Sequence, residues 1–475
     1  MKIVRCLSIL ALATAMLSGC GGGKGSSAPA PANLTVTPED GQITLNWDVV
    51  SGVQYRVYCA PGASVDNYSW YTTLGGASRA DYLNKVLPPF TVDTLQNGLQ
   101  YACTVDGRYD NGPAGPAAAS RTATPQSAGT TWASASPTGL GPGALRGVAA
   151  GTLTGFSVDK FLAVSDSALL VTDDYLQGTW TTVSTLPSGL GNLNTVLVNN
   201  GRVYVAGSSG LVAYSSDLQN WAVTPASIGG PVRKLVGFGS WLLALGDAGL
   251  IRSSAYNDGY NWATPTSVPS NAPTLRDAAY SEAGYWVAVG DSGAVWVSSA
   301  SDPAASTWTQ ATASSASANL TSVAALKVQT PNTSTFDYQL VAVGDGGMLG
   351  YSTAADPQKW TWQTIGGGVA LKQVVSGGQA LAKIDSTNSK IYIYSGGQFM
   401  VSGAGGTVWR SGDALSWTLQ NASPAWEDVS AHVGMTQDPV ALLRYSKLAN
   451  YAGGIVRTAY AWLLYGSDGT GRYAR

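Results

Sequence analysis

The sequence predicts an all-β protein in which a small β-sandwich precedes a ring of repeated sheets. Three observations lead to this fold class. Aspartate outnumbers glutamate by 25 to 3, and aspartate favours turns because it hydrogen-bonds to local backbone. Short alternating apolar runs are separated by glycine-bearing turns over most of the chain. From residue 126 onward one pattern recurs with a period of about 40 to 55 residues, which is typical of propellers and other repeat arrays.

The composition also limits the chemistry that the chain can perform. Charged residues make up only 11% of the 475 residues, and His432 is the single histidine. One histidine excludes a zinc site built on several imidazoles and leaves at most one imidazole base. The net charge of −2 is too small to indicate a nucleic-acid partner. We therefore expect no metal, no cofactor and no nucleic acid.

The amino terminus is typical of an exported protein. Two cations precede an apolar run of signal-peptide length, Cys6 to Met16. The following Leu17-Ser18-Gly19-Cys20 resembles the bacterial lipobox, which implies cleavage before Cys20 and attachment of lipid to that cysteine. In the alternative interpretation, residues 1–19 are an ordinary secretory signal and Cys20 is incidental.

Residues 20–32 form the next element, a linker rich in Gly, Ser, Ala and Pro. Such a linker is flexible and has an r.m.s. reach of roughly 20 Å. Gly21 stands where an aspartate retains enterobacterial lipoproteins at the inner membrane, so the resemblance favours the outer membrane of a Gram-negative bacterium. We expect a protein of the cell envelope that is anchored to the membrane by lipid.

Residues 33–125 predict the small sandwich, because short alternating strands are separated there by turn signals. The runs Gly41 to Trp47 and Leu95 to Tyr101 resemble the buried-tryptophan strand and the tyrosine corner of fibronectin type III domains. On that resemblance, Cys59 and Cys103 fall on neighbouring strands of one sheet. In an exported protein we expect such a pair to form a disulfide. A pair of buried free thiols is the alternative.

The clearest repeat of the second part runs from Leu275 to Trp308. It contains a half-buried strand, the apolar strand Tyr285 to Gly290, the turn Asp291-Ser292-Gly293, a third strand and a strand that bears Trp308. Four antiparallel strands are the content of one propeller blade. The tryptophans that end successive repeats are Trp180, Trp221, Trp262, Trp308, Trp360 (or Trp362) and Trp417.

Six complete repeats precede a seventh that begins near Trp426 and has no tryptophan strand of its own. An isolated tryptophan strand lies around Trp132, just before the first repeat. Closure of a ring removes exposed sheet edges. We therefore predict that residues 126–475 form a seven-bladed β-propeller, closed where the strand near Trp132 completes the last blade beside Gly471 to Arg475.

Aspartate recurs in two kinds of turn. The turns Ser215 to Trp221 and Ser411 to Trp417 resemble the Asp-box turns of sialidase-type (BNR) propellers. The photosystem II assembly-factor family is the better match through its Val-Gly-Asp-x-Gly turn, and by analogy it implies a protein-binding role. Calcium sites are a possible role for the aspartates of these turns. They lie in separate blades, so we expect them instead to cap local backbone amides; they are Asp217, Asp247, Asp291, Asp345 and Asp413.

Catalysis finds little support among these residues. The sialidase resemblance implies a Phe/Tyr-Arg-Ile-Pro motif, which is absent, and a glutamate partner for a tyrosine nucleophile. Only Glu282 and Glu427 are available within the repeats, and neither has a recognisable catalytic context. A Ser-His-Asp site needs His432 and a Gly-x-Ser-x-Gly elbow, which is also absent. We expect a non-enzyme, with a divergent sialidase-like glycoside hydrolase as the alternative.

One position of the innermost strand is polar in every repeat. Equivalent positions of a ring lie around its axis, so four cations and one anion are predicted to converge near one face and to attract an anionic ligand or acidic peptide. The alternative is that these side chains are merely solvated at the rim. The positions are Arg146, Asn194, Arg233, Arg276, Thr321, Lys372 and Glu427.

The last repeat has roughly 27 residues, Val433 to Ala459, between its first two apparent strands. Long insertions on one face of a repeat array are common binding sites, so Tyr445, Lys447 and Tyr451 are candidate contacts. A tyrosine-rich plug over the ring is the alternative. Together these features predict a non-catalytic envelope lipoprotein whose propeller binds a protein or glycan partner in an assembly or adhesion role.

Overall fold

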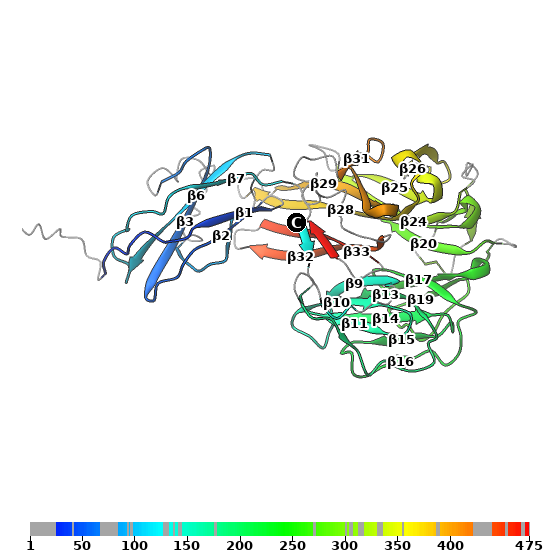
Figure 1. The fold of residues 1–475 in the computed structure, drawn as a ribbon. Helices are drawn as coiled ribbons and strands as arrows, with labels where there is room; N and C mark the ends of the chain where they lie inside the picture. The colour runs from blue at the N-terminus through cyan, green and yellow to red at the C-terminus, as the bar shows by residue number, and fades with distance from the viewer. Residues whose placement is uncertain are drawn as a thin grey trace, which may run out of the picture. The chain divides into compact units, whose positions relative to one another are not determined.

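The computed structural model divides the chain into two compact units, Met1–Pro125 and Gln126–Arg475 (Figure 1). Every regular element that it describes is a strand or a three-residue 3₁₀ turn. Among the described residues, no helix is long and apolar enough to cross a membrane. The described residues are 25–39, 42–66, 84–92, 95, 98–126, 133–135, 138–140, 145–174, 178–268, 272–299, 302–303, 307–311, 318–329, 336–353, 356–385, 390–420, 439–451, 455–466 and 471–474.

The first unit contains two antiparallel sheets around one core. Apolar side chains of both sheets are buried in one cluster, and Trp47 meets Tyr55 there with ring centroids 5.5 Å apart. Alternation explains the faces: in the second strand Ile43 and Leu45 are fully buried while their neighbours are not. The first sheet has the order β1 (Thr35–Glu39), β2 (Gln42–Asn46), β5 (Phe90–Val92), and the second β4 (Asn84–Val86), β3 (Val53–Pro61), β6 (Tyr101–Tyr109), β7 (Arg121–Ala123).

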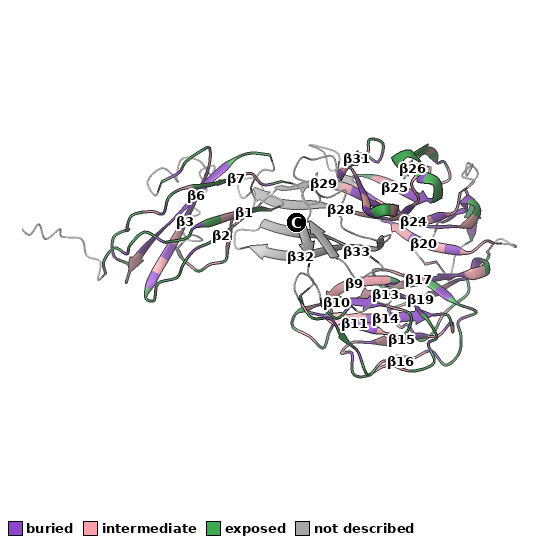
Figure 2. Ribbon diagram, in the orientation of Figure 1, coloured by how far each residue is buried: buried purple, intermediate pink, exposed green. Residues whose placement is uncertain are grey.

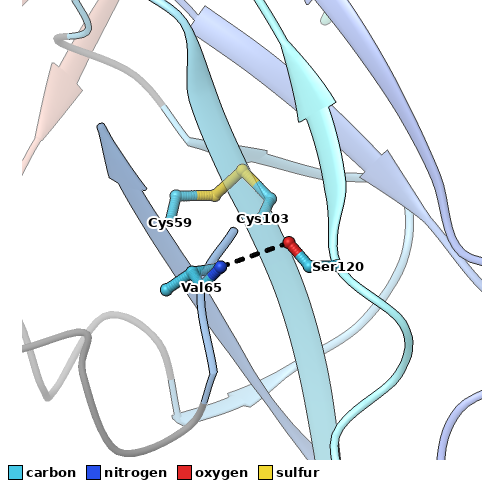
Figure 3. The surroundings of a disulfide bond; sticks show 4 residues. All are labelled: Cys59, Val65, Cys103 and Ser120. Carbon is cyan, nitrogen blue, oxygen red and sulfur yellow. Dashed lines mark hydrogen bonds between the residues drawn. A yellow bond between two sulfur atoms is a disulfide. The ribbon is translucent and has the colours of Figure 1, made fainter. Parts of the chain in front are cut away.

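A disulfide joins the two long central strands of the second sheet. Cys59 of β3 lies directly opposite Cys103 of β6, and both side chains are buried. Close by, the Val65 amide donates to the Ser120 hydroxyl at 3.3 Å (Figure 3). The predicted disulfide is confirmed, and the alternative of two free thiols is wrong.

The second unit is a series of antiparallel sheets, each a meander of consecutive strands. Five of them follow one another, and the third sheet lacks a regular fourth strand, which is replaced by a single bridge between Ser253 and Ala263. The strands are β9 (Gly147–Thr152), β10 (Asp159–Val164), β11 (Leu169–Thr172), β12 (Thr181–Thr182); β13 (Leu193–Asn199), β14 (Arg202–Gly207), β15 (Val212–Ser215), β16 (Ala222–Val223); β17 (Val232–Phe238), β18 (Trp241–Gly246), β19 (Ile251–Ser254); β20 (Leu275–Ser281), β21 (Tyr285–Gly290), β22 (Val295–Ser298), β23 (Trp308–Gln310); and β24 (Leu320–Gln329), β25 (Phe336–Gly344), β26 (Met348–Thr353), β27 (Thr361–Thr364).

One larger sheet completes the unit. Two long hairpins meet in it, because β28 pairs with β33 through Leu381 opposite Arg457 and Ala382 opposite Val456. At its far edge β34 pairs with β8, the strand that precedes all the others of this unit. The strands are β28 (Leu371–Asp385), β29 (Lys390–Gly403), β30 (Thr407–Ser411), β31 (Thr418–Leu419), β32 (Pro439–Tyr451), β33 (Ile455–Gly466), β34 (Gly471–Ala474) and β8 (Ala133–Ala135).

The innermost strands of successive sheets are neighbours in the order β9, β13, β17, β20, β24, β28, β32, and β32 is again next to β9. Buried residues run along the central strands of the described sheets, while exposed residues gather in the outer loops (Figure 2). The tryptophans predicted to end the repeats lie in or directly before outer strands, as Trp180 does before β12 and Trp308 does within β23. The exception is Trp262, which lies directly before the isolated bridge residue Ala263. Polar residues of the inner strands therefore lie around a common axis, whereas polar residues of the outer loops face solvent.

The turns Ser215 to Trp221 and Ser411 to Trp417 have the capping geometry that the sequence predicts. One oxygen of Asp217 accepts the amides of Gln219 and Asn220 at 2.9 and 2.8 Å. Asp413 accepts those of Leu415 and Ser416 at 2.9 and 2.7 Å. Because these bonds stabilise the charged carboxylate, they lower the pKa of both aspartates.

Replacing both cysteines by alanine (Cys59→Ala/Cys103→Ala) is expected to destabilise the first unit by about 3–4 kcal/mol. The disulfide closes a loop with a sequence separation of 44, and a loop of this length restricts the unfolded chain by that order of free energy. Hydrogen–deuterium exchange of peptides from β3 and β6, measured on the full chain, reports the change. Reductant should reproduce the loss in the parent protein and change nothing in the double variant; equal protection in all samples contradicts the prediction.

Candidate functional site

A cavity of about 180 Å³ lies among the inner strands of the second unit. Its lining is polar and comes from the start of each inner strand. Six of the seven side chains predicted to converge do line it, although they come from six separate repeats. These six are Arg146, Asn194, Arg233, Arg276, Thr321 and Lys372.

A β-bulge places most of these side chains. In β20, Leu275 pairs with Gly290 and Asp277 pairs with Val289, so Arg276 is the extra residue. The same shift occurs in β13, β17, β24 and β28. A bulge bends its strand locally and redirects a side chain, so each of these five strands turns one polar residue toward the cavity. The bulged positions are Asn194, Arg233, Arg276, Thr321 and Lys372.

The arginines are paired with aspartates of the same sheet. Arg233 binds Asp247 and Arg276 binds Asp291, each through Nε to a carboxylate oxygen. Arg146 binds Asp166 in the same way. The three arginines therefore converge on the cavity as ion pairs, because each guanidinium is matched by a carboxylate from the adjoining turn. The pairs are partly exposed, and such pairs contribute little to stability.

The same pairs correct the prediction for the Gly-Asp turns. In the 3₁₀ turns Asp247–Gly249, Asp291–Gly293 and Asp345–Gly347, the residue at the amino-terminal cap is a glycine, which has no side chain for capping, and the middle residue has a left-handed conformation. Asp345 accepts a bond from the Asn319 amide at 3.2 Å. These aspartates reach across to the inner strand, because the glycine before each one pairs with the residue before the bulge.

Two uncharged members of the set connect neighbouring sheets. The Asn194 amide donates to the Val232 carbonyl at 2.8 Å, and the Thr321 hydroxyl donates to the Leu371 carbonyl at 2.9 Å. Both acceptors belong to the inner strand of the next sheet. The cavity wall is thus held together by the residues that line it.

A second layer of inter-sheet bonds lies one residue further along, and the sequence analysis missed it. The buried Asp277 carboxylate accepts the Ser322 hydroxyl at 2.6 Å and the Val323 amide at 3.2 Å, both from β24. Lys234 of the preceding sheet lies 3.7 Å from its other oxygen. One carboxylate therefore joins three consecutive sheets. The sequence does contain a signal for this bond: the charged Asp277 directly follows the cavity-lining Arg276 in a strand that is otherwise mostly apolar.

The strand pairing of the last repeat does not support Glu427, the seventh residue predicted to line the cavity. Glu427 and His432 lie outside the described residues. The strand that neighbours β9 and β28 is β32, and its register shifts between Pro439 and Ala441. Val440 therefore occupies the position that Glu427 was predicted to hold. The last repeat was misaligned because its inner strand begins later than the Trp426 pattern suggests.

The predicted insertion is also corrected. Tyr445, Lys447 and Tyr451 lie within the regular strand β32, opposite Ala461, Ala459 and Ile455 of β33. The segment is a long hairpin and not a binding loop. The sequence Ala452-Gly453-Gly454 supplies a turn signal between two runs of strand-forming residues, which could have revealed it.

The described residues offer little that resembles a catalytic or metal centre. Glu282 pairs with Lys327 at 2.6 Å in a solvent-exposed contact, at the end of β20 opposite to Arg276. Within the described part of the chain, no group of three or more His, Cys, Asp or Glu side chains is arranged to hold a metal ion. The central cavity can offer paired charges, hydroxyls and amides to a ligand.

Asp277→Ala is expected to destabilise the second unit by about 1–3 kcal/mol, because the change leaves the buried Val323 amide without its acceptor, while the Ser322 hydroxyl keeps only the longer bond to the Val374 carbonyl. Urea unfolding of the full chain, followed by tryptophan fluorescence, measures the loss. The matched control is Asp356→Ala, whose carboxylate forms a largely exposed pair with Lys359 and should change stability by less than about 0.5 kcal/mol. Equal effects of the two variants would exclude a structural role for the inter-sheet carboxylate.

Comparison with known proteins agrees with the repeated sheets. Residues 152–283 match the family described as "DUF6242 beta propeller domain". No curated protein matches the chain. Among solved structures, "YCF48 bound to D1 peptide" is similar at 15% identity and a TM-score of 0.45, covering 72% of this chain and 94% of that one. "Crystal structure of WD40 beta propeller domain of Doa1" is similar at 10% identity and a TM-score of 0.45, covering 72% and 95%. The family match identifies β-propeller structure in the stretch that it spans.

Proposed function

We propose that the second unit is a closed seven-bladed propeller and that the first unit is a domain of fibronectin type III type. The cyclic order of inner strands supports the ring, and so does the pairing of β34 with β8. The buried Trp47 and the two-sheet core support the sandwich. In this arrangement the propeller is the binding platform and the sandwich a spacer.

We propose further that the platform is non-catalytic and binds a protein partner over the central cavity. The observation that carries this proposal is the repeated bulge, which directs one polar side chain from each of five repeats into a single cavity. At about 180 Å³, the cavity is smaller than the roughly 300–1,000 Å³ of small-molecule sites. It suits one inserted side chain of a partner whose surface covers the rim, where the partly exposed Arg–Asp pairs supply both signs of charge for complementary contacts.

The platform belongs, in this proposal, to a lipid-anchored protein of the cell envelope, held at the outer membrane through Cys20. The lipobox-like sequence before Cys20 supports the anchor, and the confirmed disulfide agrees with an oxidising compartment. The linker of residues 20–32 would keep the folded units clear of the lipid surface.

Cys20→Ser is expected to release the protein from the membrane, because the serine hydroxyl cannot replace the thiol that carries the lipid. Fractionation of cells followed by mass spectrometry of the mature amino terminus measures this. The parent protein should pellet with membranes and carry a diacylglyceryl-modified Cys20. A parent protein that is soluble, or that starts at another residue, contradicts the anchor but leaves the platform untouched.

Replacing Arg146, Arg233 and Arg276 together by alanine is expected to reduce partner capture at least tenfold in a tagged pull-down from crosslinked envelopes. Lys359→Ala, which removes an exposed cation elsewhere, should leave capture unchanged. A swap of one pair, Arg276→Asp/Asp291→Arg, keeps the ion pair but moves the guanidinium away from the rim. If the swapped protein and the triple variant both capture the partner normally, the cavity is not the docking site.

A further inference from the structure

We propose a second ligand site in the propeller unit: a groove at the third sheet that binds a neutral carbohydrate chain. The groove has a volume of about 810 Å³ and shares no lining residue with the central cavity. It is formed by residues of the second, third and fourth sheets and the loops between them. The residues that carry the argument are Arg202, Trp241, Ser253, Tyr256, Asp258 and Trp262.

Three aromatic side chains line this groove, and one of them is unusually exposed. Tyr256 is 88% exposed, whereas Trp241 and Trp262 are half-buried. A sugar ring has an apolar face of C–H groups and an edge of hydroxyls. Flat aromatic faces pack against the C–H face by dispersion and burial of apolar surface. The three rings thus offer a surface suited to sugar units.

The loop that presents Tyr256 is held rigid from below. The Asn257 carbonyl accepts bonds from Arg202 at 3.0 Å and from the Tyr204 hydroxyl at 2.8 Å, both on the second sheet. The Asn257 amide donates to the Ser240 carbonyl at 2.9 Å. Tyr256 and Asn257 both have positive φ, 57° and 53°, a costly conformation that persists only when surrounding contacts enforce it. The backbone that carries the exposed ring is therefore fixed before binding, which lowers the entropic cost of binding.

Polar groups that can bind the hydroxyl edge of a sugar also line the groove, beside the three aromatic rings. Asp258 uses one carboxylate oxygen, Oδ2, to accept the backbone and side-chain amides of Asn261 at 2.9 and 2.7 Å, and this fixes the carboxylate at the groove. Ser253 is 1% exposed, and its Oγ has no hydrogen-bond partner among the described atoms. Because this Oγ is buried, the polar contacts to a ligand come from the Asp258 carboxylate and the Arg202 guanidinium, which also line the groove.

Size and charge favour a neutral sugar chain over other ligands. The volume is in the usual range for ligand sites and far above that of the central cavity. Arg202, Asp258 and Asp302 bring both signs of charge to the groove, so neither an anion nor a cation is selected. Carboxylates and guanidinium groups match hydroxyls as acceptors and donors. A proline-rich peptide could use the aromatic rings, but it offers no hydroxyls to the polar groups.

The test is calorimetric titration of the full chain with maltohexaose, cellohexaose and chitohexaose, each to about 10 mM, with tryptophan fluorescence as a second readout. At least one should bind and perturb the fluorescence, because Trp241 and Trp262 line the groove. Tyr256→Ala should weaken that binding about tenfold, which corresponds to about 1.4 kcal/mol. Tyr260→Ala is the matched control: this tyrosine is 41% exposed in the same loop but does not line the groove, and it should change affinity less than twofold.

Three results would overturn the proposal: no binding of any of the three sugars, equal effects of the two tyrosine variants, or Tyr256-dependent binding of decaproline in place of a sugar. The Arg276→Asp/Asp291→Arg swap should leave sugar affinity unchanged. Sugar binding and partner capture at the central cavity can therefore succeed or fail separately.

Discussion

The sheets of the second unit whose side chains the structure describes have two apolar faces, and neither face can be covered from within the same sheet. In β21 every residue is buried, which requires neighbours on both sides. The core clusters accordingly cross from one sheet to the next: one unites Val287 and Val295 with Leu340, and another unites Leu243 with Trp286. A repeat that buries its surface only against neighbours must continue until it meets its own beginning or an end cap. The need to cover both faces therefore explains why successive sheets pack against one another.

The same constraint explains why polar groups are concentrated at the inner strands. Outer strands can face solvent. Inner strands of neighbouring sheets converge, so their buried hydrogen-bonding groups must find partners on one another. Asp277 does so by binding two donors of the next sheet, and Asn194 and Thr321 do so by binding carbonyls across the seam. The bulges allow an inner strand both to line the cavity and to bond to the neighbouring sheet. One residue of the strand faces the cavity, while the next residue faces the adjacent inner strand.

Much of the fold was predictable because it depends on local patterns. The repeat-ending tryptophans and the Asp-box aspartates mark outer strands and tight turns wherever they occur, and alignment of repeats alone located six of the cavity-lining residues. Pairing was harder to predict. Whether Arg276 meets Asp291 depends on the register of β20 against β21, and a bulge changes that register by one residue. The last repeat failed for a related reason: β32 carries strand-forming residues, but its pattern was read as an insertion around Tyr445.

The pairing of β8 with β34 has a consequence for the order in which the unit can fold. The partner of Ala133–Ala135 is the strand Gly471–Ala474, which lies far later in the chain. Neighbouring sheets can form as they emerge, since their contacts are local, but contacts between the two ends of a long chain are slow to form. Until Gly471–Ala474 has been synthesised, β8 lacks the partner strand that covers one of its edges, and an unpaired edge invites association with other chains. The long separation between the two strands therefore makes this sheet the part of the unit that is most open to pairing with other molecules during synthesis.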